Sequence, residues 1–333
     1  MAINGSLTIA FPHPPGIGGP GSFQMRFEKS LISRGYRVIY SFDAGNPDIV
    51  IVIGGTKRLG WLHKMRKRNI PVIYRLDGIN WLHRKVDIKL KHWVFAEYRN
   101  LNNKLIHAFF SDFIIYQSKF VQKWWEQEGL IYKKNFAVIN NGINLFDFKS
   151  SKKEIFDLKL VCLEGTLDYS PYAIELLNHL REVLHDDIKI IIYGKFINPK
   201  NISIISKKIE YKGPITRDKV SKVFQGAIYL SLDINPACPN TILEALASSA
   251  PVVAYNTGAI SELIDDTCGA IVSYGSDPWK LGMPDVNAMC QAIYQISSDY
   301  ERYSKGARNK AEKFFDIDQT VEKYISVINR MIK

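Results

Sequence analysis

The chain has 333 residues, of which 46% are hydrophobic and 23% charged. This composition is ordinary for a globular protein, and the length exceeds what one hydrophobic core usually organises, so we expect two domains. The N-terminal apolar run is too short for a signal peptide or a membrane span, which predicts a protein that works in the cytoplasm. Four cysteines without metal-like spacing are expected to be reduced structural thiols: Cys162, Cys238, Cys268 and Cys290.

The net charge of +11 belongs to the first half of the chain. Residues 1–150 contain 22 Lys and Arg against 10 Asp and Glu (+12), which leaves 22 against 23 (−1) for 151–333. Much of the excess lies in 57–68 and 80–93, where cations are interleaved with Trp61, Trp81 and Trp93. Tryptophan beside Lys and Arg suits an anionic membrane surface. The alternative is a helix that packs through Leu59, Leu62 and Met65 and exposes its charges to water. Nucleic-acid binding is not expected, because no sequence-reading module accompanies the charge.

Apolar runs and helical patterns alternate along the first half, which predicts a parallel sheet covered on both faces. The predicted strands are 7–11, 37–42, 49–53, 71–76, 113–116 and 136–139. Between them, Phe23, Phe27 and Leu31 recur at helical spacing, and Trp124 and Trp125 follow the fifth strand. The short Lys-rich segment 148–156 is the expected linker.

The second half repeats the alternation. Its predicted strands are 158–163, 188–193, 209–212, 228–232, 251–255 and 270–273. Two closing helices are expected, one with a stripe from Val286 to Ile296 and one with a stripe from Ile317 to Ile328.

Two features of the first half are candidate ligand contacts. The loop 11–23 (FPHPPGIGGPGSF) follows the first strand and opens the first helix, and its glycines allow a phosphate or sugar to approach the backbone closely. Asp77 ends the fourth strand, at the edge where open α/β sheets bind ligands. Its carboxylate could orient an acceptor hydroxyl or act as a base. The alternative for the loop is an ordinary Pro/Gly turn that joins strand to helix, and the alternative for Asp77 is a turn-forming Asp-Gly pair.

The most informative segment is 227–264 (AIYLSLDINPACPNTILEALASSAPVVAYNTGAISELI). It predicts a strand, a turn ending at an N-cap Asn240, a helix carrying Glu244 one turn in, and a buried strand. The N–H groups of Thr241 and Ile242 would then seat an anion, because a helix start leaves them unpaired and positively polarised. Glu244 shares a helix face with Asn240 and can accept hydrogen bonds from sugar hydroxyls. A phosphate-binding helix start beside a carboxylate that can bind a diol is typical of a nucleotide site.

The stretch CPNTILEALASSAPVVA followed by TGAISELI resembles the nucleotide-binding signature of GT-B glycosyltransferases, particularly the retaining family 4 (group 1). The resemblance implies that Glu244 binds the ribose hydroxyls and that the helix start faces the diphosphate. The family's first Glu, which contacts the donor sugar, is replaced here by Pro236.

The resemblance also implies further donor contacts. The family carries a Gly-Gly loop at Gly18 and Gly19, so these glycines join the nucleotide-sugar site, and Gly19 and Asp77 are the candidate catalytic residues. In the second half, the strand end at Gly165 and Thr166 faces the diphosphate, although Thr166 and Pro171 stand where the family has Arg and Lys. Lys195 is the candidate substitute cation, and Lys212 lies where the family flanks the base.

The sequence therefore predicts an α/β protein with the GT-B fold, in which two Rossmann-like domains face a cleft. Residues 1–150 would form the acceptor-side domain, 151–315 the nucleotide-sugar domain, and 316–333 a helix that packs back on the first domain. The predicted function is retaining transfer of a sugar from a nucleoside diphosphate sugar to a hydroxyl of a cell-surface polysaccharide or glycolipid precursor. No cofactor or metal is expected, because there is no Asp-x-Asp site and no His cluster. The expected partners are the donor, a glycan or lipid-linked acceptor and an anionic membrane surface contacted by the basic first domain. The alternatives are a catalytically silent GT-B subunit that binds a membrane or a partner, and a nucleotide-sugar 2-epimerase.

Overall fold

A computed structural model describes residues 7–43, 45–130, 135–148, 158–168 and 172–332. The chain forms two units, unit 1 from residues 1–142 and 317–333 and unit 2 from residues 143–316. The division after Gly142 precedes the expected boundary at 150, because Ile143 and Phe148 are buried in the core of unit 2. Most of the expected linker, residues 149–156, lies outside the described residues.

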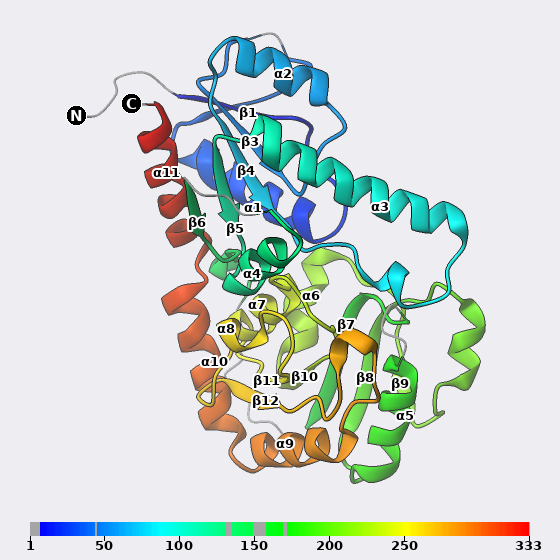
Figure 1. The fold of residues 1–333 in the computed structure, drawn as a ribbon. Coiled ribbons are helices and arrows are strands. Elements are labelled where there is room, and N and C mark those ends of the chain that lie inside the picture. Colours follow the sequence, from blue (N-terminus) through cyan, green and yellow to red (C-terminus); the bar gives the residue numbers. More distant parts are fainter. Residues whose placement is uncertain (1–6, 44, 131–134, 149–157, 169–171, 333) are drawn as a thin grey trace. The chain divides into compact units, whose positions relative to one another are not determined.

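Unit 1 contains a parallel six-stranded sheet in the order β2-β1-β3-β4-β5-β6 (Figure 1). Its strands are β1 (Thr8–Phe11), β2 (Arg37–Tyr40), β3 (Ile49–Ile53), β4 (Val72–Leu76), β5 (Phe113–Tyr116) and β6 (Phe136–Val138). Its helices are α1 (Gly19–Ser33), α2 (Leu59–Lys67), η1 (Leu82–Arg84), α3 (Leu90–Leu105), η2 (Ile106–Phe110), α4 (Lys119–Gln127) and α11 (Ile317–Ile332).

The core of unit 1 joins both ends of the chain. The α1 stripe of Phe23, Phe27 and Leu31 is fully buried against inward residues of the sheet. Tyr324 of α11 packs against Phe27, with ring centroids 4.7 Å apart. The C-terminal helix thus covers the same sheet face as α1.

Gly142 lets α11 approach the segment after β6 closely. A Cβ atom there would lie 2.7 Å from the Ile317 Cα and 2.7 Å from the Thr320 Oγ1. Gly142→Ala is therefore expected to lower the free energy of unfolding by about 1–3 kcal/mol, because backbone cannot move aside as a flexible side chain can. Urea unfolding measures the loss. Gly60→Ala is the control, since that exposed helical position has open space around it; an equal or larger loss there would contradict the prediction.

Unit 2 contains a second parallel six-stranded sheet, in the order β12-β11-β10-β7-β8-β9. Its strands are β7 (Lys159–Thr166), β8 (Lys189–Lys195), β9 (Ile209–Tyr211), β10 (Ala227–Ser231), β11 (Val252–Tyr255) and β12 (Gly269–Val272). Its helices are η3 (Leu145–Asp147), α5 (Ala173–Val183), η4 (Pro199–Ile204), α6 (Arg217–Phe224), α7 (Asn240–Ala247), α8 (Ile260–Leu263), η5 (Pro278–Lys280), α9 (Val286–Ser298) and α10 (Tyr300–Phe314).

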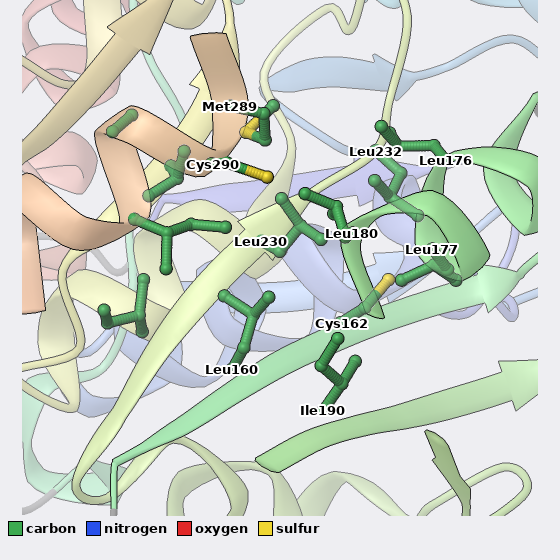
Figure 2. Close-up of a cluster of buried hydrophobic side chains, with 14 of the residues drawn as sticks. Leu160, Cys162, Leu176, Leu177, Leu180, Ile190, Leu230, Leu232, Met289 and Cys290 are labelled. Atoms are coloured by element: carbon green, nitrogen blue, oxygen red, sulfur yellow. The ribbon is translucent and has the colours of Figure 1, made fainter. Parts of the chain in front are cut away.

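Alternating strand residues divide unit 2 into two apolar cores. Leu160, Cys162 and Leu230 face α5 and α9 on one side of the sheet, as Figure 2 shows. Val161, Leu163 and Tyr229 face α6, α7, α8 and α10 on the other side. All four cysteines are buried and free. Two parallel sheets that pack against helices confirm the predicted α/β class.

The two predicted closing helices are present as α9 and α11, and a third helix that the sequence did not predict, α10, lies between them. Its buried residues are Tyr303, Ala307 and Ala311, which recur at four-residue spacing but are small or aromatic instead of branched aliphatic. A stripe of this kind gives a weak hydrophobic pattern. Within the described residues, no helix combines the length and apolar character needed to cross a membrane.

Candidate functional site

The predicted donor-site residues of unit 2 gather at one edge of its sheet. Because the strands are parallel, their carboxyl ends meet at the same edge. Gly165 and Thr166 end β7, Lys195 ends β8 opposite Thr166, and Lys212 follows β9. The loop after β10 leads from this edge into α7.

Helix α7 starts one residue earlier than the sequence predicted. Pro239 occupies the N-cap position with φ −68° and ψ 124°, and Asn240 is the first helical residue, without a side-chain cap. The proline ring fixes the φ angle of the N-cap residue, from which the helix begins. The predicted N-cap was Asn240, so this prediction was wrong by one residue. The N–H groups of Thr241 and Ile242 still belong to the first turn, whose donors the helix itself does not use. The Ile242 side chain is fully buried, so only its backbone can face a ligand.

Glu244 lies on the outward face of α7. Asn240, Thr241 and Glu244 are half-buried, whereas Ile242, Leu243, Ala245, Leu246 and Ala247 are buried in the core. The carboxylate therefore does not point into the apolar interior and stays beside the helix start.

The candidate cations of unit 2 differ in their surroundings. Lys195 is exposed at the end of β8. Lys212 forms an ion pair with Glu210 at 2.8 Å, which raises the pKa of its ammonium group. Gly165 has open space at its Cβ position, so a ligand can approach the backbone there. Lys195 is the stronger candidate for a phosphate, because the charge of Lys212 is already compensated; Pro171 lies outside the described residues.

Pro236 has a structural task in this chain. It is buried, and its carbonyl accepts a hydrogen bond from the Ala259 N–H at 2.9 Å. Gly258, with φ +59°, packs so closely that a Cβ atom would lie 2.5 Å from that carbonyl oxygen. By the family resemblance, this position would carry the Glu that contacts the donor sugar. In this chain, Pro236 instead packs against the backbone of Gly258 and Ala259.

Two carboxyl groups that the sequence analysis did not single out lie at this edge. Glu164 accepts a hydrogen bond from the Tyr229 hydroxyl at 3.2 Å and one from the Leu232 N–H, and Asp233 follows directly. Burial raises the pKa of Asp233 to about 6, and burial together with the Asp233 charge raises the pKa of Glu164 well above its usual range. Both residues come straight after an apolar run, so the rule that selected Asp77 could have found them.

The Asp233 carboxyl gives a pH-dependent prediction. Its pKa is 3.8 in an unperturbed chain and about 6 here, so between these values the folded state binds more protons and stability falls as pH rises. Because the Asp233 charge also raises the pKa of adjacent Glu164, the loss of stability belongs to the pair and is at most about 3 kcal/mol. Asp233→Asn is expected to flatten the decline in unfolding free energy between about pH 4 and pH 6. Urea titrations across that range test this, with exposed Asp266→Asn as control; an unchanged slope in Asp233→Asn would contradict it.

In unit 1, the Gly-rich loop and Asp77 meet beside Gly54. A Cβ atom on Gly54 would lie 2.3 Å from the Asp77 Oδ2 and 3.3 Å from the Pro20 Cβ. Gly18 precedes α1 with φ +89°, a conformation that favours glycine, and has open space at its Cβ position. Gly18 and Gly19 are both exposed, so their backbone faces solvent at the start of a 15-residue helix.

Asp77 is held in a polar network. Its Oδ1 accepts hydrogen bonds from Arg75 and from the Gln117 Nε2, the latter at 2.9 Å. Arg75 is 1% exposed, also donates to Gln117 and Asn141, and lies over the Phe23 ring at 4.4 Å. Through Arg75 and Gln117 the Asp77 carboxylate links the ends of β4 and β5, and its part in orienting a hydroxyl or acting as a base stays a prediction.

Among the described residues, no group of three or more His, Cys, Asp or Glu side chains could hold a metal ion. The candidate site consists of backbone donors, the Glu244 carboxylate and a lysine. These groups suit an anionic ligand with vicinal hydroxyls.

The chain is similar to known proteins in one segment of its sequence and in its fold. Residues 164–299 match the model of the family described as "Glycosyl transferases group 1". No curated protein matches the sequence. Among solved structures, sucrose-phosphate synthase from Thermosynechococcus elongatus is similar at 14% identity, with 98% of this chain and 99% of that chain covered and a TM-score of 0.72.

Two further structures are similar over nearly the whole chain. Anabaena Alr3699/HepE, solved in complex with UDP and glucose, has 14% identity, covers 97% of this chain and 100% of its own, and gives a TM-score of 0.71. AviGT4, a glycosyltransferase involved in avilamycin A biosynthesis, has 12% identity, covers 98% of each chain and gives 0.66. Residues 164–299 therefore match a group 1 glycosyltransferase domain, and the chain has the GT-B fold of its structural neighbours.

Proposed function

We propose that this protein moves a sugar from a nucleoside diphosphate sugar to an acceptor hydroxyl, and that the donor binds at the start of α7. The observation that carries the proposal is the placement of Asn240, Thr241 and Glu244 on the outward face of α7, inside the matched segment 164–299. The helix start offers N–H donors to a diphosphate, and Glu244 offers acceptors to ribose hydroxyls. Because HepE was solved in complex with UDP, UDP is the first nucleotide to test.

The chemistry in this proposal rests on positioning. Backbone donors at a helix start stabilise the charge that develops on a departing diphosphate. Exposed Lys195 adds a positive charge at the end of β8, which β7 separates from β10 in the sheet. Asp233 and Glu164 are candidates for the donor-sugar contact that Pro236 cannot make. Gly18 and Gly19 stay predicted donor contacts and Asp77 a predicted contact of the acceptor hydroxyl, and retention of configuration stays a prediction from the family resemblance.

The acceptor is proposed to be a polysaccharide or glycolipid precursor at an anionic membrane surface. The basic charge of unit 1 supports this proposal: its residues contain 24 Lys and Arg against 11 Asp and Glu, or +13, whereas unit 2 has 20 against 22, or −2. The alternative that α2 packs through its apolar residues describes that helix well, since Leu62 and Met65 are buried and Trp61 is half-buried. The cytoplasmic location stays a prediction from the sequence.

A panel of nucleotide sugars tests the proposal. Incubation with each donor, scored for released nucleoside diphosphate, is expected to single out one donor that also raises the melting temperature. Release of a changed nucleotide sugar without an acceptor would favour an epimerase. A panel with neither turnover nor a thermal shift would overturn the proposal in favour of a silent subunit.

A further inference from the structure

The buried residues of helix α3 are polar, and several of its large apolar residues are exposed. The buried side chains of Leu90–Leu105 are Asn100, Asn102 and Asn103. The exposed ones include Leu90 (75%), Val94 (53%), Tyr98 (45%) and Leu101 (57%). A helix on a soluble surface normally shows the opposite arrangement.

The inward asparagines explain why the helix is held this way. Asn100 accepts a hydrogen bond from the Asn80 N–H at 3.0 Å and donates to the Asn80 carbonyl at 2.8 Å. Asn102 donates to the Thr56 carbonyl at 2.8 Å. These amides satisfy loop backbone that would otherwise be buried without partners, so α3 cannot turn its apolar side inward without breaking them.

The exposed apolar residues form one stripe. Leu90, Val94, Tyr98 and Leu101 stand at helical spacing, and Trp93, 41% exposed, flanks them. Glu97 lies within the stripe but its carboxylate is turned onto η1, where it pairs with His83 at 2.8 Å and with Arg84. A contiguous apolar surface of this kind marks an interaction site.

Cations border the stripe. Lys89 and Lys91 are exposed on either side of Leu90, and Lys85 is exposed just before the helix. The Phe95 ring lies 5.6 Å from the Lys57 Nζ and 4.4 Å from the Arg99 guanidinium. Aromatic and aliphatic side chains bordered by Lys and Arg match the boundary between anionic headgroups and acyl chains.

We propose that the outward face of α3, formed by Leu90, Trp93, Val94, Tyr98 and Leu101, inserts into the headgroup region of an anionic lipid surface. This inference rests on the proposed membrane contact of unit 1 and names the surface that makes it. Charge decides between lipid and a second copy of the chain, because two copies would bring two basic faces together whereas an anionic bilayer complements them. The α3 face supplies the apolar part of the binding and the bordering cations supply the salt-dependent part.

Vesicle flotation of the full chain tests the inference. Wild type is expected to bind phosphatidylcholine vesicles that contain phosphatidylglycerol, more weakly as salt rises, and to bind pure phosphatidylcholine poorly. Val94→Gln/Leu101→Gln keeps the net charge and is expected to weaken binding about tenfold or more. Lys89→Gln/Lys91→Gln is expected to weaken it several-fold and to lower its salt dependence. The control Ile202→Gln/Ile204→Gln removes two exposed apolar side chains from unit 2 and should bind as wild type does.

Three results would overturn the inference. They are no flotation of wild type at low salt, equal binding by Val94→Gln/Leu101→Gln, or an equal loss in the unit 2 control. Light scattering without lipid adds a fourth, a wild-type dimer that Val94→Gln/Leu101→Gln converts to monomer, which would assign the face to self-association. The nucleotide-induced thermal shift depends on α7 and is recorded for the same variants, so failure of donor binding and failure of membrane binding are separate results.

Discussion

Replacing Glu244 with alanine is expected to weaken nucleotide binding by about 1–3 kcal/mol, or about 5- to 150-fold in Kd. The carboxylate is half-buried on the outward face of α7, one turn after the helix start, where it can accept two hydrogen bonds from a ribose. Removing it leaves those hydroxyls without acceptors. Calorimetric titration with UDP, or with the nucleotide that the donor panel selects, measures the loss.

Two variants frame this experiment. Glu244→Gln keeps one acceptor oxygen and removes the charge, so its affinity is expected to lie between wild type and Glu244→Ala. Glu175→Ala removes an exposed glutamate from α5 of the same unit and is expected to bind the nucleotide normally. Unchanged affinity in Glu244→Ala would exclude this residue from the donor site.

Replacing Arg75 with methionine is expected to lower the free energy of unfolding of unit 1 by about 3–5 kcal/mol. Arg75 is almost fully buried and donates to Asp77, Gln117 and Asn141. Its loss leaves the Asp77 carboxylate, only 18% exposed, and the two buried amides without this donor. Five of the six tryptophans belong to unit 1, so fluorescence during urea unfolding reports mainly on that unit.

Arg34→Met is the matched control, because Arg34 also pairs with two carboxylates of unit 1, Asp318 and Glu322, which are 54% and 64% exposed. Water compensates the loss of an exposed pair, so about 1 kcal/mol or less is expected. Arg75→Met/Asp77→Asn should recover part of the Arg75→Met loss, since it removes the stranded charge. Losses of equal size in Arg75→Met and Arg34→Met would refute the assignment of this network as a buried anchor.

The strands of this protein were predictable because fully buried parallel strands read as short apolar runs. The predicted runs 49–53 and 113–116 coincide with β3 and β5, and the other ten agree to within a few residues. Helix α10 was missed because its inward residues are one tyrosine and two alanines, and the boundary at 150 was late because Phe148 belongs to the core of unit 2. Periodicity reports on large apolar side chains, so small ones and single buried aromatics near a linker escape it.

The placement of Asn240 and Glu244 on one face at the start of a helix was predictable from the sequence, whereas their part in donor binding stays a prediction. The raised pKa values of Glu164 and Asp233 were not predictable, because they depend on how deeply two strand ends bury their carboxyl groups. The orientation of α3 was also beyond the sequence. Its outward face is set by hydrogen bonds from Asn100 and Asn102 to loops that lie about 20 and 46 positions away in the chain.

Helix α11 has a consequence for how the polypeptide is made. Unit 1 is discontinuous: it is left at Gly142 and completed only by Ile317–Lys333, whereas unit 2 is one uninterrupted stretch. A ribosome therefore releases every residue of unit 2 before the helix that shields Phe27 exists. During synthesis unit 2 can therefore fold before unit 1 is complete. Until α11 has been made, the aromatic side chains of unit 1 that it covers stay exposed, and chaperones bind exposed apolar surface of this kind.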